Sequence, residues 1–205
     1  MRNLRHFSSS GVAIVSLLLF AACSSASASE SKLSWPLERA AYRPTPLFFG
    51  LYVTPDPANN PIDPPERFTG YHVGTDFEIT WGEKNADVPV FAICHGEVIY
   101  SGFADGYGGL IAQRCSIDSE PAVVLYGHLA LDPLPTVQDT LVAGERIGKL
   151  AQAKSHDSDD NRKHLHLGIV KGTEISYLGY VQTADDLQNF MDADEVLSRW
   201  GVLAP

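Results

Sequence analysis

The histidines are the residues of this chain whose types and spacing most clearly indicate a chemical function. The 205 residues contain seven histidines, and Asp76 follows His72 by four positions in the stretch Tyr-His-Val-Gly-Thr-Asp. His164 and His166 form a second pair, separated by one leucine. Imidazole and carboxylate groups are zinc ligands, and they also act as general acids and bases. The patterns therefore predict a metal centre if the fold brings both pairs together.

The spacing of both pairs favours extended chain over helix. Gly74 lies between His72 and Asp76, so we expect a strand that bends at this glycine and brings the two side chains to one place. Alternate residues of a strand project to the same face, which would put His164 and His166 side by side while the intervening leucine enters the core.

A catalytic zinc ion takes three protein ligands and leaves one position open for water. His72, Asp76 and one histidine of the second pair would complete such a set, and the residues alone leave open which one. The other, together with His128, would lie beside the activated water, where imidazoles accept a proton or stabilise an oxyanion. Each motif alone also arises by chance, and a lone strand histidine is more often a satisfied polar group.

The elements that must position these side chains have the pattern of strands. Short apolar, largely β-branched runs alternate with turns, often about ten residues apart, which predicts a mainly β fold, an antiparallel β-sandwich or barrel-like structure. Residues 54–66 contain five prolines and are predicted to be a loop, as is the polar segment 151–163. The expected strands are 47–53, 71–79, 88–93, 97–100, 110–114, 122–129 and 165–170.

The last stretch, 184–200, has a different pattern. Its apolar residues recur at spacings of three, four and seven, which predicts one or two amphipathic helices packed on the sheet. We expect a main domain at 46–180 and a C-terminal helical extension at 181–205.

The N-terminal segment is typical of an export signal. Two arginines precede an uncharged run of 12 residues, 11–22, which is too short for a stable membrane span. It ends in Ala-Ala-Cys, so we expect residues 1–22 to be removed as a signal peptide and Cys23 to be lipidated, although Phe20 replaces the usual leucine. Residues 23–45 would be tether and lead-in. The alternative is ordinary signal cleavage after Ala28.

Both interpretations place the protein in the periplasm or cell envelope, and lipidation would anchor it at the outer membrane. Because Arg2 and Arg5 leave with the signal, 13 of the 15 Lys and Arg residues remain against 25 Asp and Glu, a net charge near −12. Such an acidic protein is not built to neutralise phosphates, which argues against nucleic acid as a partner.

Once Cys23 is lipidated or removed with the signal, Cys94 and Cys115 remain as a pair. Several glycines lie between them, which predicts a hairpin whose turn is about midway, so the two could face each other across it. In an oxidising compartment this favours a disulfide. The alternative is two small buried thiols.

The order and context of the motifs resemble the lysostaphin-type (LytM-type) peptidoglycan metalloendopeptidases. The resemblance extends from about residue 49 to residue 172. Its main segments are Gly-Tyr-His-Val-Gly-Thr-Asp-Phe at 70–77, Val-Pro-Val-Phe-Ala at 88–92, Gly-Glu-Val-Ile-Tyr-Ser-Gly at 96–102, Val-Leu-Tyr-Gly-His-Leu at 124–129, Gly-Glu-Arg-Ile-Gly at 144–148 and His-Leu-His-Leu-Gly-Ile at 164–169.

The resemblance implies a duplicated hybrid β-motif and one Zn²⁺ per chain. It implies zinc ligation by His72, Asp76 and His166, and it implies that His128 and His164 act on the water and the transition state. The implied substrate is the peptide stems of peptidoglycan, cut by a zinc-activated water.

The segment 150–163 departs from the family pattern, because relatives usually have a Gly/Thr/Ser-rich turn there. Its Asp157-x-Asp159-x-Asn161 fragment lacks the glycine and glutamate of a calcium loop, so we predict a solvated loop with His156 exposed. His95 matches no ligand position and is expected at the surface or groove.

Two other functions compete with the endopeptidase. A LytM-like domain could have lost catalysis and activate another cell-wall hydrolase, but such relatives typically lose ligands and all five positions are filled here. A periplasmic zinc carrier would need a closed or histidine-rich site, and the acidic segment 150–163 with its single histidine, His156, is poor support for one.

Overall fold

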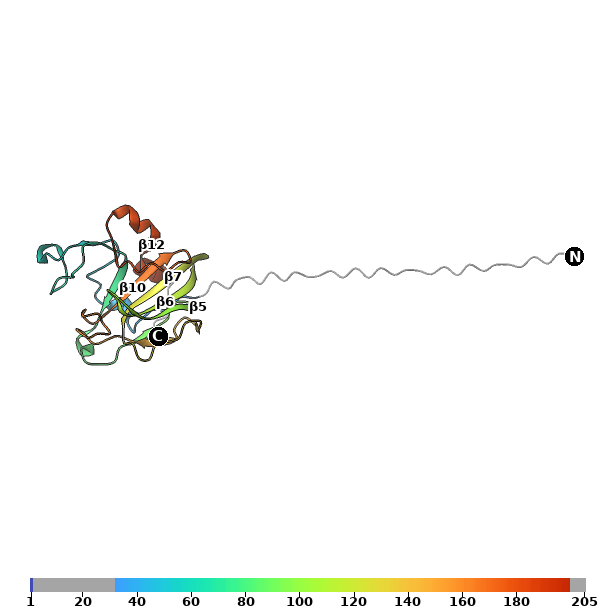
Figure 1. The fold of residues 1–205 in the computed structure, drawn as a ribbon, viewed down its shortest axis with the longest axis horizontal. Helices are drawn as coiled ribbons and strands as arrows, with labels where there is room; N and C mark the ends of the chain where they lie inside the picture. Colours follow the sequence, from blue (N-terminus) through green and yellow to red (C-terminus); the bar gives the residue numbers. More distant parts are fainter. Residues whose placement is uncertain (2–31, 200–205) are drawn as a thin grey trace.

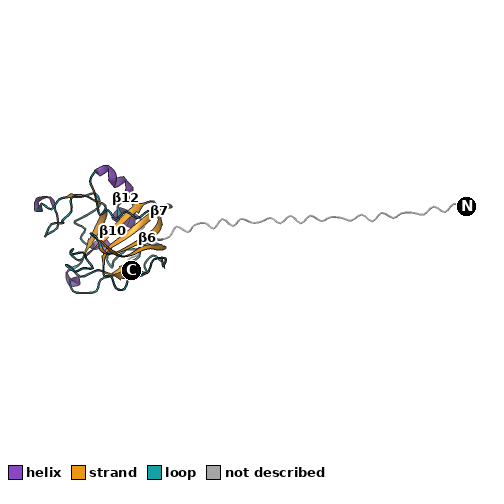
Figure 2. Cartoon of the chain, in the orientation of Figure 1, coloured by secondary structure: helices purple, strands orange, loops and turns teal. Residues whose placement is uncertain are grey.

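The computed structural model describes Met1 and residues 32–199 (Figure 1). The predicted signal peptide, the lipidation site at Cys23 and the end of the C-terminal segment lie outside these residues, so those expectations stay predictions. Strands and loops dominate, with few helices (Figure 2). None of the helices among the described residues has the length and apolar character needed to cross a membrane.

The chain forms twelve strands, four 3-10 turns and one α-helix within the described residues. Their bounds are η1 Ala40–Tyr42, β1 Tyr52–Val53, η2 Pro57–Asn59, β2 Gly70–His72, β3 Gly74–Glu78, η3 Trp81–Glu83, β4 Pro89–Phe91, β5 Gly96–Ala104, β6 Gly108–Ile117, β7 Glu120–Leu129, β8 Thr140–Leu141, β9 Arg146–Lys149, β10 His164–Lys171, β11 Tyr180–Val181, η4 Ala184–Asn189, β12 Phe190–Met191 and α1 Ala193–Arg199.

A seven-stranded sheet is the frame of the molecule, and all its pairings are antiparallel. Its order is β12-β10-β7-β6-β5-β8, with β3 also paired to β10. Strands β1, β2 and β11 form a second sheet, and β4 pairs with β9. The central strands β5, β6, β7 and β10 lie side by side (Figure 1). The predicted antiparallel, mainly β fold is confirmed.

Strand β10 is buried along nearly its whole length, and its alternation divides two kinds of side chain. Leu165, Leu167 and Ile169 enter the larger hydrophobic core. His164 and His166 alternate with them, so they belong to the opposite face of the strand. The period-2 pattern read from the sequence thus separates core residues from candidate site residues.

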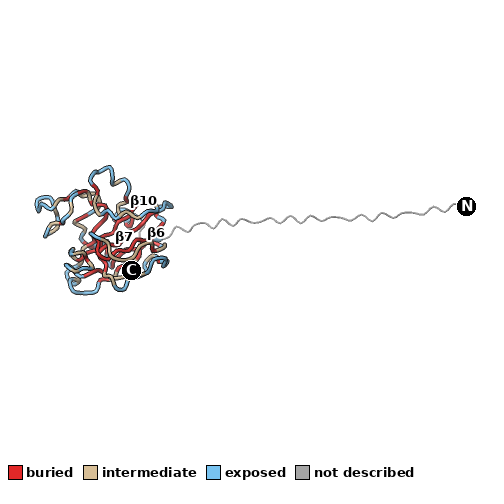
Figure 3. The backbone as a smooth tube through the Cα atoms, viewed as in Figure 1, coloured by how far each residue is buried: buried red, intermediate tan, exposed pale blue. Residues whose placement is uncertain are grey.

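The core lies between the main sheet and the segments that cover it. Buried chain is concentrated in the central strands, and exposed chain in the loops around them (Figure 3). The larger core also contains Leu33, Trp35 and Leu37. These residues lie in the segment 23–45, which the sequence predicted to be a tether and lead-in to the domain. The lead-in is irregular in structure, and its apolar side chains are nevertheless part of the packed domain.

Two predicted elements are shorter than expected. The predicted strand at 47–53 is realised only at β1, because Gly50 adopts a φ of 80° and the chain turns there. In the C-terminal stretch the single α-helix has seven residues, and Phe190 and Met191 form strand β12 instead of a helical face. Pairing of these two residues with Val170 and Ile169 satisfies backbone groups that a continuous helix would have withdrawn from the sheet.

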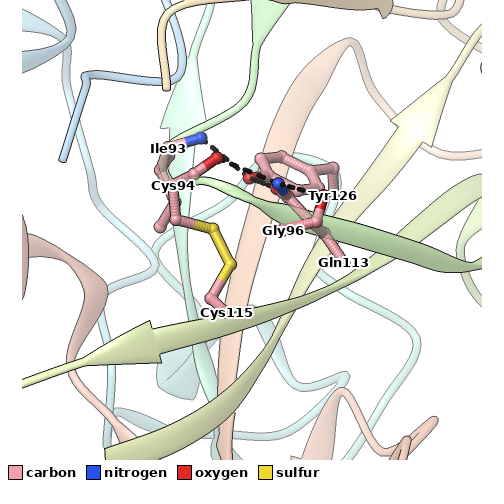
Figure 4. The surroundings of a disulfide bond; sticks show 6 residues. All are labelled: Ile93, Cys94, Gly96, Gln113, Cys115 and Tyr126. Atoms are coloured by element: carbon pink, nitrogen blue, oxygen red, sulfur yellow. Dashed lines mark hydrogen bonds between the residues drawn. A yellow bond between two sulfur atoms is a disulfide. The ribbon is translucent and has the colours of Figure 1, made fainter. Parts of the chain in front are cut away.

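The predicted disulfide between Cys94 and Cys115 is present, with Cα atoms 6.1 Å apart (Figure 4). It joins the end of the β4–β5 connection to β6. Beside it, Gln113 donates to the Cys94 carbonyl at 2.9 Å and accepts from the Tyr126 hydroxyl at 2.8 Å. The same hydroxyl accepts from the Ile93 backbone N–H at 2.8 Å, so buried polar groups and the bridge anchor one connection together.

Removing this disulfide should lower the free energy of unfolding without removing the candidate site. The bridge spans 21 residues of sequence, for which loss of the loop constraint costs about 3 kcal/mol. The double variant Cys94→Ala/Cys115→Ala, compared with the parent chain in urea unfolding, measures this difference. Reducing agent should destabilise the parent and leave the double variant unchanged; equal stabilities of the two chains would contradict the prediction.

Candidate metal centre

Three side chains from three strands converge on one point. His72 ends β2, Asp76 lies in β3 and His166 in β10. His166 Nδ1 is 3.0 Å from His72 Nε2 and 3.0 Å from Asp76 Oδ1, and His72 Nε2 is 3.3 Å from the same oxygen. All three side chains are almost fully buried. The structure therefore brings together the His-x-x-x-Asp motif and the second histidine of the His-x-His motif.

Local backbone structure explains this convergence. Asp76 and His166 are directly opposite residues in the β3–β10 pair, so their side chains share a face. The extended chain breaks at Val73, between β2 and β3, one residue before the glycine at which the sequence predicted a bend; Gly74 itself begins β3. Gly74 must lack a side chain, because a Cβ there would lie 2.6 Å from the His166 ring and 2.8 Å from the Leu167 carbonyl.

The charge states suit a cation ligand set. Burial raises the pKa of Asp76, but the neighbouring His164, His72 and His166 outweigh it and hold this pKa well below its usual value. Burial also lowers the pKa of His166, which keeps its imidazole neutral at physiological pH. An ionised carboxylate and a neutral imidazole both present lone pairs to the shared point.

The geometry of these atoms fits a zinc ion. Tetrahedral zinc with ligands at about 2.0–2.1 Å places neighbouring ligand atoms about 3.3 Å apart, close to the separations of 3.0, 3.0 and 3.3 Å found here. The other ring nitrogens, His72 Nδ1 and His166 Nε2, have no hydrogen-bond partner among the described residues. The inner nitrogens thus make the polar contacts of both rings within the described residues, and both are directed at the point shared with Asp76.

His128 and His164 lie beside this cluster and are held differently. Their ring centroids are 4.4 Å apart, and His164 Nε2 is 3.1 Å from Asp76 Oδ2. His164 Nδ1 is 3.1 Å from the Arg162 carbonyl, and His128 Nδ1 is 3.2 Å from the Ser158 carbonyl. Because a carbonyl can only accept, each Nδ1 carries a proton, which leaves Nε2 of a neutral His128 free to accept one. Nε2 of His164 instead faces the Asp76 carboxylate, to which it can only donate.

The backbone of His128 is held in an unusual conformation. Its φ of 63° is left-handed, at the end of β7, and its N–H donates to the Tyr107 carbonyl at 2.9 Å. Such conformations in non-glycine residues cluster at functional sites. Burial, followed by the charge of His164, lowers the pKa of His128 well below its usual value, so its imidazole is neutral.

A pocket of about 270 Å³ opens over these residues. Aromatic side chains form much of its wall: Phe68 stacks on Tyr180 with centroids 5.3 Å apart, and Tyr177 and Leu178 are exposed at the pocket. The pocket also reaches Asp76, His128, His164 and His166.

Sequence reasoning missed several residues around the site. Tyr107 is buried, lies in the pocket wall, and its ring centroid is 5.3 Å from that of His166. Tyr180 lies 5.2 Å from the His72 ring, and no local pattern indicated either tyrosine. Arg162 binds Asp76 Oδ2 at 2.7 Å. Its position two residues before His164 continues the alternation of the His-x-His strand, and that signal could have found it.

The polar loop 151–163 is not simply solvated, contrary to expectation. Ser158 is fully buried, the Asp157 carboxylate accepts from the Leu131 N–H at 3.1 Å, and the Asp157 carbonyl accepts from the Gly109 N–H at 2.8 Å. Gly108, with a φ of 64°, permits this approach, because a Cβ there would lie 2.0 Å from the Asp157 carbonyl oxygen. The loop folds onto the β5–β6 turn because its carboxylates and carbonyls find backbone donors there.

The remaining histidines of the described chain are outside the cluster. His95 is exposed, as predicted. His156 is exposed and stacks on Phe103 with centroids 4.6 Å apart. Neither contributes a ligand atom to the three-residue cluster.

Comparisons with known proteins identify a family and a fold. A model of peptidase family M23 matches residues 70–177, which include all five candidate site residues. Lysostaphin, described as an antimicrobial peptidase from Staphylococcus simulans, has a similar solution structure, with a TM-score of 0.53 and 21% sequence identity. That alignment covers 86% of this chain and 58% of lysostaphin, so the chain spans little more than half the length of that protein.

Two further structures have the same fold. The SpoIIQ–SpoIIIAH pore-forming complex gives a TM-score of 0.52 at 16% identity, covering 82% of this chain and 92% of the other. CbpA from L. salivarius REN gives 0.51 at 17% identity, covering 82% and 96%. A search among curated protein sequences gives no match. At these identities the likeness establishes the fold alone.

Proposed function

The chain belongs to peptidase family M23, and from this we propose that it is a zinc metalloendopeptidase that hydrolyses peptide cross-links of bacterial peptidoglycan. One observation carries the proposal. Two histidines and a carboxylate face one another at tetrahedral-edge distances, beside two further histidines whose Nδ1 atoms donate to backbone carbonyls.

In this proposal His72, Asp76 and His166 hold one zinc ion. When bound, zinc supplies Lewis acidity, which polarises a carbonyl and makes a water molecule more acidic. The chain's own residues align the substrate and exclude water. The aromatic wall formed by Phe68 and Tyr180 aligns the substrate peptide, and burial of the cluster limits competing water.

His164 and His128 supply proton transfer and charge stabilisation. His164 Nε2 lies next to the ligand carboxylate, and in its unprotonated form it can accept a proton from the attacking water and return it to the leaving amine. Once protonated, it is stabilised by Asp76 at 3.1 Å. His128, whose ring lies against that of His164, can donate to the oxyanion that develops on the scissile carbonyl once its Nε2 has taken up a proton.

Location at the cell envelope is part of the proposal. It rests on the signal-like segment 1–22 and on Cys23, which would carry the lipid that anchors the chain to the outer membrane. The peptide stems of the wall would then be the substrate within reach.

Zinc content and digestion of purified peptidoglycan test the proposal together. We expect about one zinc per chain and new peptide ends, both abolished by a chelator and restored by added zinc. Bound zinc without cleavage would refute the endopeptidase and favour the non-catalytic activator of another hydrolase. Absence of zinc binding would refute the metal centre itself.

A further inference from the structure

Arg162 connects three carboxylates at the edge of the candidate metal centre. Its Nη2 is 2.7 Å from Asp76 Oδ2 and 2.7 Å from Glu78 Oε1, and its Nη1 binds Glu66. The side chain of Arg162 is 18% exposed and those of Asp76 and Glu66 are 3% and 6% exposed. A guanidinium has several donors in a fixed planar arrangement and is suited to binding several carboxylates at once, whereas an ammonium is a point charge.

This contact divides the two oxygens of Asp76 between different partners. Oδ1 faces His72 and His166 at 3.3 and 3.0 Å, whereas Oδ2 receives the guanidinium and lies 3.1 Å from His164 Nε2. With Oδ2 engaged, rotation of the carboxylate about its Cβ–Cγ bond is blocked. One oxygen therefore remains directed at the point where the two ligand imidazoles converge.

The residues that hold Arg162 come from separate segments. Glu78 is in β3, two positions beyond Asp76, and Glu66 is in the proline-rich loop before β2. The Arg162 carbonyl meanwhile accepts from His164 Nδ1 at 3.1 Å. Arg162, in the polar loop 151–163, thus contacts a candidate metal ligand through its guanidinium and a candidate catalytic histidine through its backbone carbonyl.

The charges around Arg162 indicate that it favours zinc binding by holding Asp76 in place more than it disfavours it by repelling the zinc ion. A positive charge beside a metal ligand would weaken cation binding by itself, but Glu66 and Glu78 already neutralise it within hydrogen-bonding distance. Burial lowers the pKa of Arg162, but Asp76, Glu78 and Glu66 outweigh this and raise it, so the guanidinium stays charged. Its removal would leave Asp76 Oδ2 without its guanidinium partner and Glu66 and Glu78 without this cation, which would free the ligand carboxylate to rotate.

We propose that Arg162 is a positioning residue for zinc, fixing Asp76 as a one-oxygen ligand by binding its second oxygen while Glu66 and Glu78 hold the guanidinium in place. This inference rests on the proposed function, because it assumes that the three-residue cluster binds zinc. Outer groups of this kind typically change metal affinity by about 10–100-fold when they are removed.

Zinc affinity, measured by competition with a chromophoric chelator on the full chain in detergent, tests the proposal independently of turnover. We expect Arg162→Gln and Arg162→Lys each to bind zinc at least about tenfold more weakly than the parent, because neither side chain reproduces the planar guanidinium fork that holds Asp76, Glu78 and Glu66 together. The lysine variant retains the positive charge, so a loss of zinc affinity in that variant shows that the planar geometry of the guanidinium, and not its charge, positions Asp76. Thermal unfolding of the metal-free chains establishes that each variant is folded, and the lysine variant serves if glutamine prevents folding.

Arg67→Gln is the matched control. Arg67 also joins the proline-rich loop to the charged loop, by pairing with Asp159, but its side chain is 48% exposed and it pairs with no residue of the zinc cluster. We expect this variant to bind zinc like the parent. Parental affinity in the Arg162 variants would overturn the positioning role while leaving the proposed function intact. Failure of the parent chain to bind zinc would overturn both.

Discussion

Replacement of His166 by alanine should abolish zinc binding and peptidoglycan cleavage together. His166 Nδ1 lies 3.0 Å from both of the other candidate ligand atoms, so its loss leaves two ligands where a catalytic zinc site needs three. Removal of an outer partner already costs about 10–100-fold in metal affinity, so loss of a direct ligand should exceed about 100-fold. Zinc stoichiometry after dialysis and release of peptide ends measure the two losses.

His95→Ala is the matched control for this variant. His95 is exposed and outside the cluster, so its replacement should leave zinc content and cleavage unchanged. Thermal unfolding of metal-free His166→Ala separates ligand loss from unfolding, because the removed ring leaves a cavity beside Gly74 and Gly168. Stoichiometric zinc in a folded His166→Ala chain would remove His166 from the ligand set.

His164→Ala should have the opposite combination of effects, retaining zinc but losing turnover. Its Nε2 faces Asp76 Oδ2 and not the oxygen shared by the ligand histidines, so the three-ligand set remains intact. General acid–base catalysis contributes about 10²–10⁴-fold, and we expect a loss of that size in kcat with a much smaller change in KM. Zinc analysis and initial rates on soluble peptidoglycan fragments measure both quantities on one preparation.

Two results would contradict this assignment. Turnover near that of the parent would exclude His164 as the proton acceptor. Loss of zinc from a folded His164→Ala chain would make it a ligand instead, with the consequence that the roles of the two His-x-His residues are exchanged. The same His95→Ala control applies.

Most of the sheet could be predicted from the sequence because it depends on local patterns. The apolar runs at 122–129 and 165–170 specify buried strands, and the glycines between Cys94 and Cys115 specify the β5–β6 hairpin that lets the cysteines meet. The His-x-His spacing likewise separates the site face of β10 from its core face. The C-terminal stretch was harder, because a spacing that suits a helix was overridden at Phe190 and Met191 by pairing with β10.

What the sequence by itself determined is the chemistry: which residues can bind zinc, which can accept a proton, and that strands present them. The tertiary structure alone decided their partners. Contact between His72 and His166 joins residues 94 positions apart, and Arg162 meets Glu66 across 96 positions. No local period encodes such distances, because they follow from which strands pair and how loops fold over them. The charged loop illustrates the reason: its composition suggested solvation, whereas backbone donors on a distant hairpin fixed it over the site.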